Sequence, residues 1–249
     1  MKKNLGQNFL IDKNIAELEV KHADIKNDDI VLEIGPGKGI LTKILAEKAK
    51  KVIAIEIDKN LVNNLRNILP ENVDLIHGDA LNIDFKTLPK FNKIVSNLPF
   101  KISSPITFKF LDYDFEIAIL IYQKEFAERL IANPGSKNYS RLSVGVYYKS
   151  VCDLIKTIPK TCFKPQPKVD SSMIRIIPRK TPPFILINEK FFFNLTKNLF
   201  NYRRKKIKNI LNKLYDFNLD KLPYLENRVE ELSPMQIGEL SDILYKILN

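Results

Sequence analysis

The stretch Glu33-Ile34-Gly35-Pro36-Gly37-Lys38-Gly39 constrains this chain more than any other. It follows an apolar, β-branched segment over 30–32 that predicts a buried strand, and it precedes a segment over 40–47 with apolar residues at helical spacing. A strand, a glycine turn and a helix open a βαβ unit, and glycines let the backbone turn sharply and lie against a ligand. The dinucleotide fingerprint of nicotinamide dehydrogenases needs a glycine where this chain has Ile40, and an ordinary tight turn remains an alternative.

Strand-like and helix-like segments alternate along the first part of the chain. Further strands are predicted over 51–56, 73–76, 93–96, 116–122, 151–158 and 171–177, and helices over 13–23, 123–133 and after Asp58. This alternation predicts an α/β fold with a doubly wound, mostly parallel sheet. Beyond the prolines at 178, 182 and 183 the pattern changes to helices over 191–201, 203–214 and from Ser233 onward. We therefore expect two domains, 1–180 and 181–249, of which the second is small and helical.

Polar residues stand at the ends of three predicted strands that follow the glycine loop. Glu56 ends the strand over 51–56, Asp79 follows the next strand, and Asn97 follows the strand over 93–96. In a doubly wound sheet, ligands bind beyond the carboxyl ends of the strands. A carboxylate at Glu56 can accept hydrogen bonds from ribose hydroxyls, and Asp79 can accept one from an adenine amino group. The pattern indicates an adenosine-bearing cofactor, and both NAD and S-adenosylmethionine satisfy it.

The tetrapeptide Asn97-Leu98-Pro99-Phe100 favours the methyl donor. An exocyclic amino group on adenine is a weak nucleophile, because its lone pair is delocalised into the ring. The Asn97 side-chain oxygen and the Leu98 carbonyl can each accept one N–H of such a group and aim its lone pair. Pro99 holds these acceptors rigid, and the Phe100 ring offers a stacking face for a flipped-out base. A simple turn is the alternative interpretation.

The charge and the rare residue types narrow the class of protein. The net charge of +11 favours a polyanionic partner, although a lysine-rich genome would produce the same excess. Two cysteines and two histidines, without metal-ligand spacing, predict no metal site and free thiols in a reducing cytoplasm. No apolar run has the length of a membrane span. A basic run expected on a helix can line up with phosphates, so the candidate RNA-binding residues are Arg203, Arg204, Lys205, Lys206 and Lys208, and a solvated helix face is the alternative.

Taken together, the motifs resemble those of the ribosomal RNA adenine N6,N6-dimethyltransferases. The matching runs are 5–10, 33–39, 56–58, 78–80, 97–100, 123–125, 140–144, 163–171 and 200–205. The resemblance implies a class I S-adenosylmethionine-dependent methyltransferase with a Rossmann-like, mostly parallel seven-stranded sheet and a C-terminal helical rRNA-recognition domain. It implies a cofactor site formed by Asn8, Leu10, Gly35, Gly37, Gly39, Glu56, Asp79, Ala80 and Asn97. It implies a catalytic group formed by Asn97, Leu98, Pro99, Phe100 and Phe163, with Phe163 beside the target base.

The same resemblance implies the substrate: two adjacent adenosines in a hairpin loop near the 3′ end of small-subunit rRNA. We expect S-adenosylmethionine as donor, S-adenosylhomocysteine as product, a pre-ribosomal 30S-type particle as partner, a role in subunit biogenesis, and a cytoplasmic monomer without a metal. Two alternatives remain. One is a large-subunit rRNA adenine N6-methyltransferase, and the other is a ribosome-assembly factor that acts mainly by binding. The glycine spacing and the lack of a histidine acid or base disfavour a nicotinamide dehydrogenase.

Overall fold

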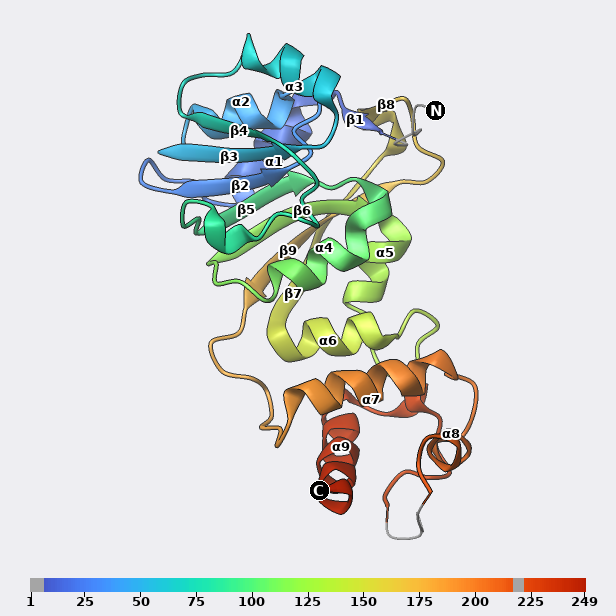
Figure 1. Cartoon of the computed structure of the whole chain (residues 1–249). Coiled ribbons are helices and arrows are strands. Elements are labelled where there is room, and N and C mark those ends of the chain that lie inside the picture. Colours follow the sequence, from blue (N-terminus) through green and yellow to red (C-terminus); the bar gives the residue numbers. More distant parts are fainter. Residues whose placement is uncertain (1–6, 217–221) are drawn as a thin grey trace. The chain divides into compact units, whose positions relative to one another are not determined.

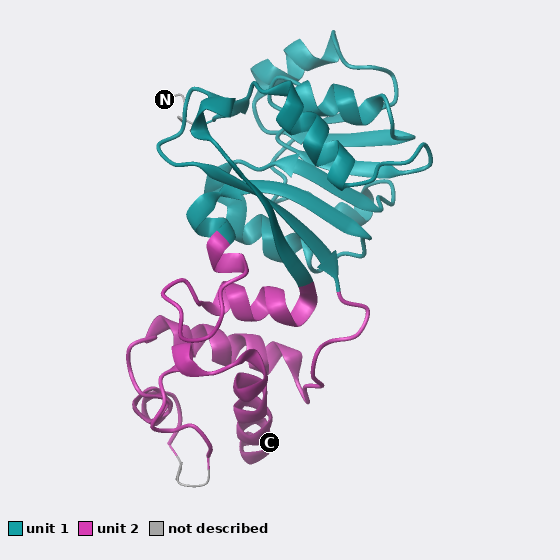
Figure 2. Cartoon of the chain, turned by 180° about the vertical axis from the view of Figure 1, so that it is seen from behind, with its two compact units in different colours: residues 1–127, 151–178 teal, residues 128–150, 179–249 magenta. Residues whose placement is uncertain are grey.

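The computed structural model describes residues 7–216 and 222–249, which belong to two compact units (Figure 2). Unit 1 consists of residues 1–127 and 151–178, and unit 2 consists of residues 128–150 and 179–249. The chain passes from unit 1 to unit 2 for the last time after residue 178, beside the predicted domain boundary at 180. The contiguous division 1–180 and 181–249 nevertheless fails for residues 128–150. These residues join the helical unit because Tyr139, Val144 and Tyr148 are buried in its core.

Unit 1 is built on a seven-stranded sheet with the order β4-β3-β2-β5-β6-β9-β7 (Figure 1). The strands are β2 (Ile30–Ile34), β3 (Lys51–Glu56), β4 (Val73–His77), β5 (Lys93–Asn97), β6 (Ile117–Gln123), β7 (Ser150–Ile158) and β9 (Ser171–Pro178). Neighbouring strands from β4 to β6 are parallel, and β9 pairs antiparallel with β6. The predicted strands and the mostly parallel seven-stranded sheet are therefore confirmed.

Helices follow the strands. The pattern predicted four of those that begin in unit 1, over 13–23, over 40–47, after Asp58 and over 123–133, but not the helix over 103–110. Those that begin in unit 1 are α1 (Lys13–His22), α2 (Ile40–Ala46), α3 (Lys59–Arg66), α4 (Ser103–Phe110) and α5 (Lys124–Leu130). The carboxylates of Asp12 and Asp58 each accept a hydrogen bond of 2.9 Å from the backbone two residues on, at the start of α1 and α3. Both residues cap free N–H groups at a helix start, so the expected N-caps are confirmed.

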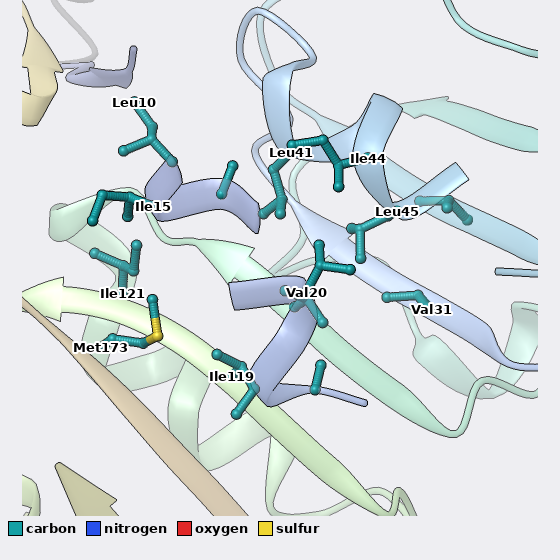
Figure 3. Close-up of a cluster of buried hydrophobic side chains, with 14 of the residues drawn as sticks. Leu10, Ile15, Val20, Val31, Leu41, Ile44, Leu45, Ile119, Ile121 and Met173 are labelled. Atoms are coloured by element: carbon teal, nitrogen blue, oxygen red, sulfur yellow. The ribbon is translucent and has the colours of Figure 1, made fainter. Parts of the chain in front are cut away.

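Alternating side chains of β6 show that helices lie on both faces of the sheet. Ile119 and Ile121 belong to a buried cluster with side chains of α1 and α2, and Figure 3 shows these side chains pointing toward one another. Tyr122, the residue after Ile121, points to the other face, where its hydroxyl lies 2.7 Å from the Thr107 hydroxyl of α4. Burial on both faces explains why β6 is almost wholly apolar.

A second, two-stranded sheet joins segments far apart in the sequence. β1 (Phe9–Leu10) pairs antiparallel with β8 (Phe163–Lys164), and the Ile11 N–H donates to the Cys162 carbonyl at 2.9 Å. Short 3₁₀ helices occupy four connections: η1 (Phe85–Thr87), η2 (Phe100–Ile102), η3 (Lys160–Cys162) and η4 (Val229–Glu231). The segment after residue 6 is thus held against the segment around residue 163.

Unit 2 is helical in the part of the chain that the structure describes. Its helices are α6 (Arg141–Lys149), α7 (Glu189–Asn201), α8 (Ile207–Leu214) and α9 (Pro234–Leu248). Buried apolar side chains from α6, α7, α8 and α9 form its core. At the start of α9, Ser233 and Gln236 form the predicted capping box, in which each side chain accepts a bond from the backbone of the other.

The predicted helix over 203–214 is wrong in its first turn, because α8 begins only at Ile207. Residues 202–206 form a turn between α7 and α8, and Lys206 makes an isolated β-bridge with Arg228. The Arg203 side chain accounts for this geometry, since its guanidinium is engaged by Glu230 and by the Lys137 carbonyl. The basic residues therefore lie on a turn rather than along a helix face.

Within residues 7–216 and 222–249, we find no helix with both the length and the apolar character needed to cross a membrane.

Candidate active site

A cavity in unit 1 lies where the carboxyl ends of β2, β3, β4 and β5 meet. Five segments line it: 7–10, 33–38, 55–57, 78–80 and 97–102, with Ile40 and Leu41 beneath. The glycine loop, Glu56, Asp79 and Asn97 thus come together although they are up to about 60 residues apart in the sequence. Parallel strands place their carboxyl ends on one edge of the sheet, which is the physical reason for this convergence.

The glycine loop leaves room for a ligand because its glycines adopt a left-handed backbone. Gly35 and Gly37 have φ of 71° and 58°, values that side chains with a Cβ rarely adopt. A Cβ on Gly37 would lie 2.9 Å from the Phe9 ring, and one on Gly35 would lie 3.2 Å from Pro99. These two glycines therefore allow the loop to approach β1 and the Asn97–Phe100 segment.

Gly39, which the resemblance places at the cofactor, lies at the start of α2 (Ile40–Ala46). It is the N-cap of α2, with φ of 79°, and it does not line the cavity. A Cβ there would lie 2.8 Å from a methyl group of Leu65 in α3. Gly39 therefore serves the packing of α2 against α3.

Glu56 is almost fully buried, at 3% exposure, and its carboxylate lines the cavity. It accepts hydrogen bonds from the Gly37 N–H at 3.2 Å and from the Asp58 N–H at 2.9 Å. Burial raises the pKa of Glu56, and these backbone donors oppose the rise by stabilising the ionised form. A carboxylate has about four acceptor positions, so acceptor capacity remains for a ligand such as a ribose diol.

Asp79 and Ala80 form the wall contributed by the end of β4. Asp79 folds its own segment, because Oδ1 accepts from the Leu81 N–H at 2.9 Å and Oδ2 accepts from the Asn82 side-chain amide at 3.3 Å. Ala80 is 5% exposed and presents its methyl group and backbone to the cavity. This wall can accept an amino group on a heterocycle that lies against the Ala80 backbone.

Asn97 is the last residue of β5, and Leu98, Pro99 and Phe100 continue along the cavity wall. The strand end is held in place because the Ser96 hydroxyl donates to the Ile34 carbonyl at 2.6 Å, beside the glycine loop. Pro99 has φ of −59°, and the Phe100 carbonyl accepts from the Ser103 hydroxyl at 3.0 Å at the start of α4. The side chains of Asn97 and Phe100 are half-buried, so part of each remains open to the cavity.

Phe163 does not reach the cavity. It is 2% exposed and belongs to the buried cluster that includes Leu10 and Ile15. Its segment instead supports the site, because β8 pairs with β1 and so positions Asn8 and Leu10, which do line the cavity. The structure therefore unites every predicted cofactor residue except Gly39, and every predicted catalytic residue except Phe163.

Several lining residues were not singled out from the sequence. Phe9 packs on the glycine loop with the Lys38 ammonium 5.5 Å from its ring centroid, and Ile57, 47% exposed, lies next to Glu56. Glu33 is 1% exposed and lines the cavity, and its Oε2 has no hydrogen-bond partner within residues 7–216 and 222–249. Burial raises the pKa of Glu33 to about 8. Glu33 and Ile57 both lie at the ends of predicted strands. The same position in the sequence predicted Glu56 as a site residue, so it could have predicted these two residues as well.

The basic turn of unit 2, defined as residues 203–206, is only partly available to a partner. The Arg203 guanidinium is occupied by Glu230 and by the carbonyls of Ser136 and Lys137. Lys206 and Lys208 both contact the Glu226 carboxylate, at 2.7 and 3.7 Å.

Arg204 and Lys205 are both exposed, and the Lys205 ammonium lies 5.5 Å from the Tyr202 ring centroid. These two residues are therefore better placed for phosphate contacts than Arg203.

Two observations bear on metal chemistry and on the thiols. Among the described residues, no three His, Cys, Asp or Glu side chains are grouped so that they could hold a metal ion. Cys152 and Cys162 are free thiols, as expected, and burial raises the pKa of both.

Known proteins with similar sequences belong to one family. Residues 1–246 match the family model described as ribosomal RNA adenine dimethylase. The chain is 46% identical to the probable ribosomal RNA small subunit methyltransferase A of Methanococcus aeolicus, over 99% of this chain and 97% of that protein. It is also 46% identical to the protein of that name from Thermococcus onnurineus, over 97% and 91% of the two chains.

Solved structures agree with this assignment. A dimethyladenosine transferase from Plasmodium falciparum superposes with a TM-score of 0.80 at 32% identity, over 96% of this chain and 98% of that chain. The 23S rRNA methyltransferase ErmE superposes with a TM-score of 0.74 at 27% identity, over 96% and 100%. The fold is thus that of the class I methyltransferases, as the resemblance implied. The chain belongs to the ribosomal RNA adenine dimethylase family and is an S-adenosylmethionine-dependent rRNA adenine dimethyltransferase.

Proposed function

We propose that this enzyme dimethylates the N6 amino groups of two adjacent adenosines in the hairpin loop near the 3′ end of small-subunit rRNA. The observation that carries the proposal is the single cavity that unites Glu56, Asp79 and the Asn97–Phe100 segment. The small-subunit substrate is supported by the names of relatives at 46% identity over nearly the whole chain. Loop bases are unpaired or nearly so, which lowers the energy needed to flip them into such a cavity.

The residues that line the cavity fit S-adenosylmethionine. The glycine loop over 35–37, which lines the cavity, suits the amino-acid part of the cofactor. The free acceptor positions of Glu56 suit the ribose hydroxyls, and the Asp79–Ala80 wall suits the adenine. Asn8 and Leu10 close this side of the site. When bound, the cofactor supplies a methyl group on a cationic sulfur with a neutral leaving group.

The chain's own residues orient the target base. In the first transfer, the Asn97 side-chain oxygen and the Leu98 carbonyl accept hydrogen bonds from the two N–H groups of the adenine amino group and aim its lone pair. In the second transfer one N–H remains, and one of these two acceptors binds it. Pro99 fixes the backbone between them and Phe100, and the Phe100 ring stacks on the base. Positive charge develops on the amino nitrogen as it is methylated, so both acceptors bind the transition state more strongly than the ground state. Catalysis then rests on positioning and electrostatics, without a metal.

The proposed function also assigns a role to each unit of the enzyme and a partner to the whole protein. We place catalysis in the α/β unit and rRNA recognition in the helical unit, with Arg204 and Lys205 as the leading phosphate contacts. The partner is a pre-ribosomal 30S-type particle, the enzyme acts as a cytoplasmic monomer, and binding to the particle also contributes to subunit biogenesis. The net charge of +11 supports a polyanionic partner.

Methyl transfer from labelled S-adenosylmethionine tests this function. The purified protein is incubated with small subunits that lack the modification and, in parallel, with unmethylated large subunits. We expect label only in small-subunit rRNA, and mapping should place two methyl groups on each of two adjacent loop adenosines. Label in large-subunit rRNA would instead support the large-subunit alternative. Tight binding of small subunits without label would support an assembly factor that acts by binding.

Neutralising the exposed part of the basic turn should weaken binding to the small subunit. For Arg204→Gln with Lys205→Gln, we expect the slope of log affinity against log salt concentration to become shallower by about 0.7 for each lost phosphate contact. Binding of S-adenosylhomocysteine should not change, because both residues belong to unit 2. Filter binding of labelled subunits at several salt concentrations measures the slope.

The control carries the same charge change on unit 1. Lys48→Gln with Lys50→Gln removes two exposed lysines beside α2 and should leave the slope near that of the parent. Equal slopes for both double variants would remove the basic turn from the RNA interface. Arg203→Gln, by contrast, is expected to lower the thermal stability of the protein, because Glu230 and two carbonyls would lose their partner.

A further inference from the structure

Two walls of the cavity come from different connections of the sheet. One is the segment after β4, which carries Asp79 and Ala80, and the other is the segment after β5, which carries Asn97 and Phe100. The second wall continues without a break through η2 into α4. A methyl transfer needs cofactor and target base in line, so the separation of these two walls has to be held constant.

One side chain of α4 reaches across to the first wall. The Lys109 ammonium donates hydrogen bonds to the Ala80 carbonyl at 2.9 Å, to the Leu81 carbonyl at 3.0 Å and to the Ile83 carbonyl. These three bonds use all the donors that an ammonium has. The N–H groups of the same segment turn the other way, since Leu81 donates to the Asp79 side chain.

The Lys109 side chain also packs against an aromatic ring. Its ammonium lies 4.4 Å from the ring centroid of Phe85, which is 3% exposed and stacks on Phe110 of α4. Burial lowers the pKa of Lys109, and the carboxylates of Asp84 and Asp79 oppose that change. The aromatic face and the three carbonyl dipoles each favour a held cation over a mobile surface lysine, and they offset the cost of its partial desolvation.

Lys109 does not itself line the cavity, so its role is indirect. We infer that Lys109 is a positioning residue, which ties the Asp79–Ala80 wall to α4 and thereby holds the cofactor wall in register with the Asn97–Phe100 wall. The inference rests on the proposed use of these two walls for the cofactor adenosine and for the target adenine. A charged donor suits the task, because hydrogen bonds from charged groups are shorter and stronger than those between neutral groups.

The test compares three variants of the full-length protein. Lys109→Met keeps the unbranched stem over Phe85 but removes all three donors, and Lys109→Arg keeps the charge and some donors. Lys86→Met is the matched control, because Lys86 lies on the same side of the sheet in η1 but is exposed. S-adenosylhomocysteine affinity is measured by calorimetry, and backbone amide exchange is followed by mass spectrometry without ligand.

We expect Lys109→Met to weaken S-adenosylhomocysteine binding about tenfold or more, because three carbonyls lose a charged partner and their segment relaxes. Amides of residues 80–83 should exchange faster, while those of α9 remain unchanged. The KM for S-adenosylmethionine should rise more than kcat falls. Lys109→Arg should lie closer to the parent than Lys109→Met, and Lys86→Met should match the parent.

Two results would overturn the inference. One is parental affinity and parental exchange in Lys109→Met, which would show that the bonds do not hold the wall. The other is a general loss of protection throughout unit 1, without rescue by arginine, which would show only a contribution to folding. Measurements on the parent protein test the proposed function independently of the role of Lys109. If the parent binds no S-adenosylhomocysteine and methylates no rRNA, the proposed function fails whatever the Lys109 variants do.

Discussion

Asn97→Ala is expected to lower kcat by about a hundredfold or more while changing cofactor affinity little. In the proposed mechanism, the Asn97 oxygen accepts a hydrogen bond from an N–H that strengthens as positive charge develops on the amino nitrogen, so its loss should be felt mainly in the transition state. The backbone should tolerate the change, because the Ser96 hydroxyl anchors the strand end to Ile34 and Pro99 restricts the next residues. The effect should therefore be chemical rather than structural.

Single-turnover methyl transfer to under-methylated small subunits measures this step directly, and calorimetry with S-adenosylhomocysteine serves as the control.

Variants of Phe100 test, in the same assay, whether the Phe100 ring holds the target base by stacking. Phe100→Ala should lose stacking worth about 1–3 kcal/mol, whereas Phe100→Tyr should retain most activity because the ring face is preserved. A parental single-turnover rate in Asn97→Ala would refute its role as acceptor. Parental methylation by Phe100→Ala would mean that other side chains hold the base.

Replacing Glu19 by leucine should stabilise the protein at pH 8 by about 1–3 kcal/mol, the cost of a buried polar group without a hydrogen-bond partner. Glu19 lies in α1 with 0% exposure, and neither of its carboxylate oxygens has a hydrogen-bond partner within the described part of the chain. Burial raises the pKa of Glu19 well above its ordinary value, and the nearby Glu33 raises it further. An ionisable group in this position opposes folding once the solution is no longer acidic.

The direction of the pH dependence follows from the raised pKa. Near pH 4 the carboxyl is largely protonated in both the folded and the unfolded state, and it contributes no difference. Between the ordinary pKa of 4.5 and the raised value, the unfolded state releases its proton first, so the folded state loses about 1.4 kcal/mol per pH unit. The parent should therefore lose stability as pH rises from 5 to 8, and Glu19→Leu should lose less. Glu33, whose pKa burial raises to about 8, should cause the remaining slope.

Urea unfolding at pH 5 and pH 8 measures both effects. Glu17→Leu is the matched control, because Glu17 is exposed on the same helix and forms a surface ion pair with Lys13. It should change the free energy of unfolding by less than about 1 kcal/mol. If Glu19→Leu were less stable than the parent at pH 8, the Glu19 carboxyl would have to be satisfied by a partner such as a buried water, and the expectation would be wrong.

The sequence by itself determined where the chemistry lies. The glycine loop, Glu56, Asp79 and Asn97 each follow a segment whose apolar pattern marks a buried strand, and parallel strands bring such ends to one edge. The same local patterns predicted the caps at Asp12 and Asp58. Strands, glycine turns and helix caps depend on residues within a few positions of one another. They can therefore be predicted from the sequence alone.

The tertiary structure alone decided which side chains the distant segments present to one another. Only the tertiary structure shows that the segment of Phe163 pairs with β1 and that residues 128–150 belong to the helical unit. The ion pair between Arg203 and Glu230 is likewise a tertiary contact. The tertiary structure also placed the Lys109 ammonium on carbonyls 26 to 29 residues away in the sequence. Each contact joins segments that share no local periodicity, and which partners meet depends on how the helices pack on the sheet and on one another. That packing is why the wall held by Lys109 and the buried carboxyl of Glu19 could not be predicted from their neighbours in the chain.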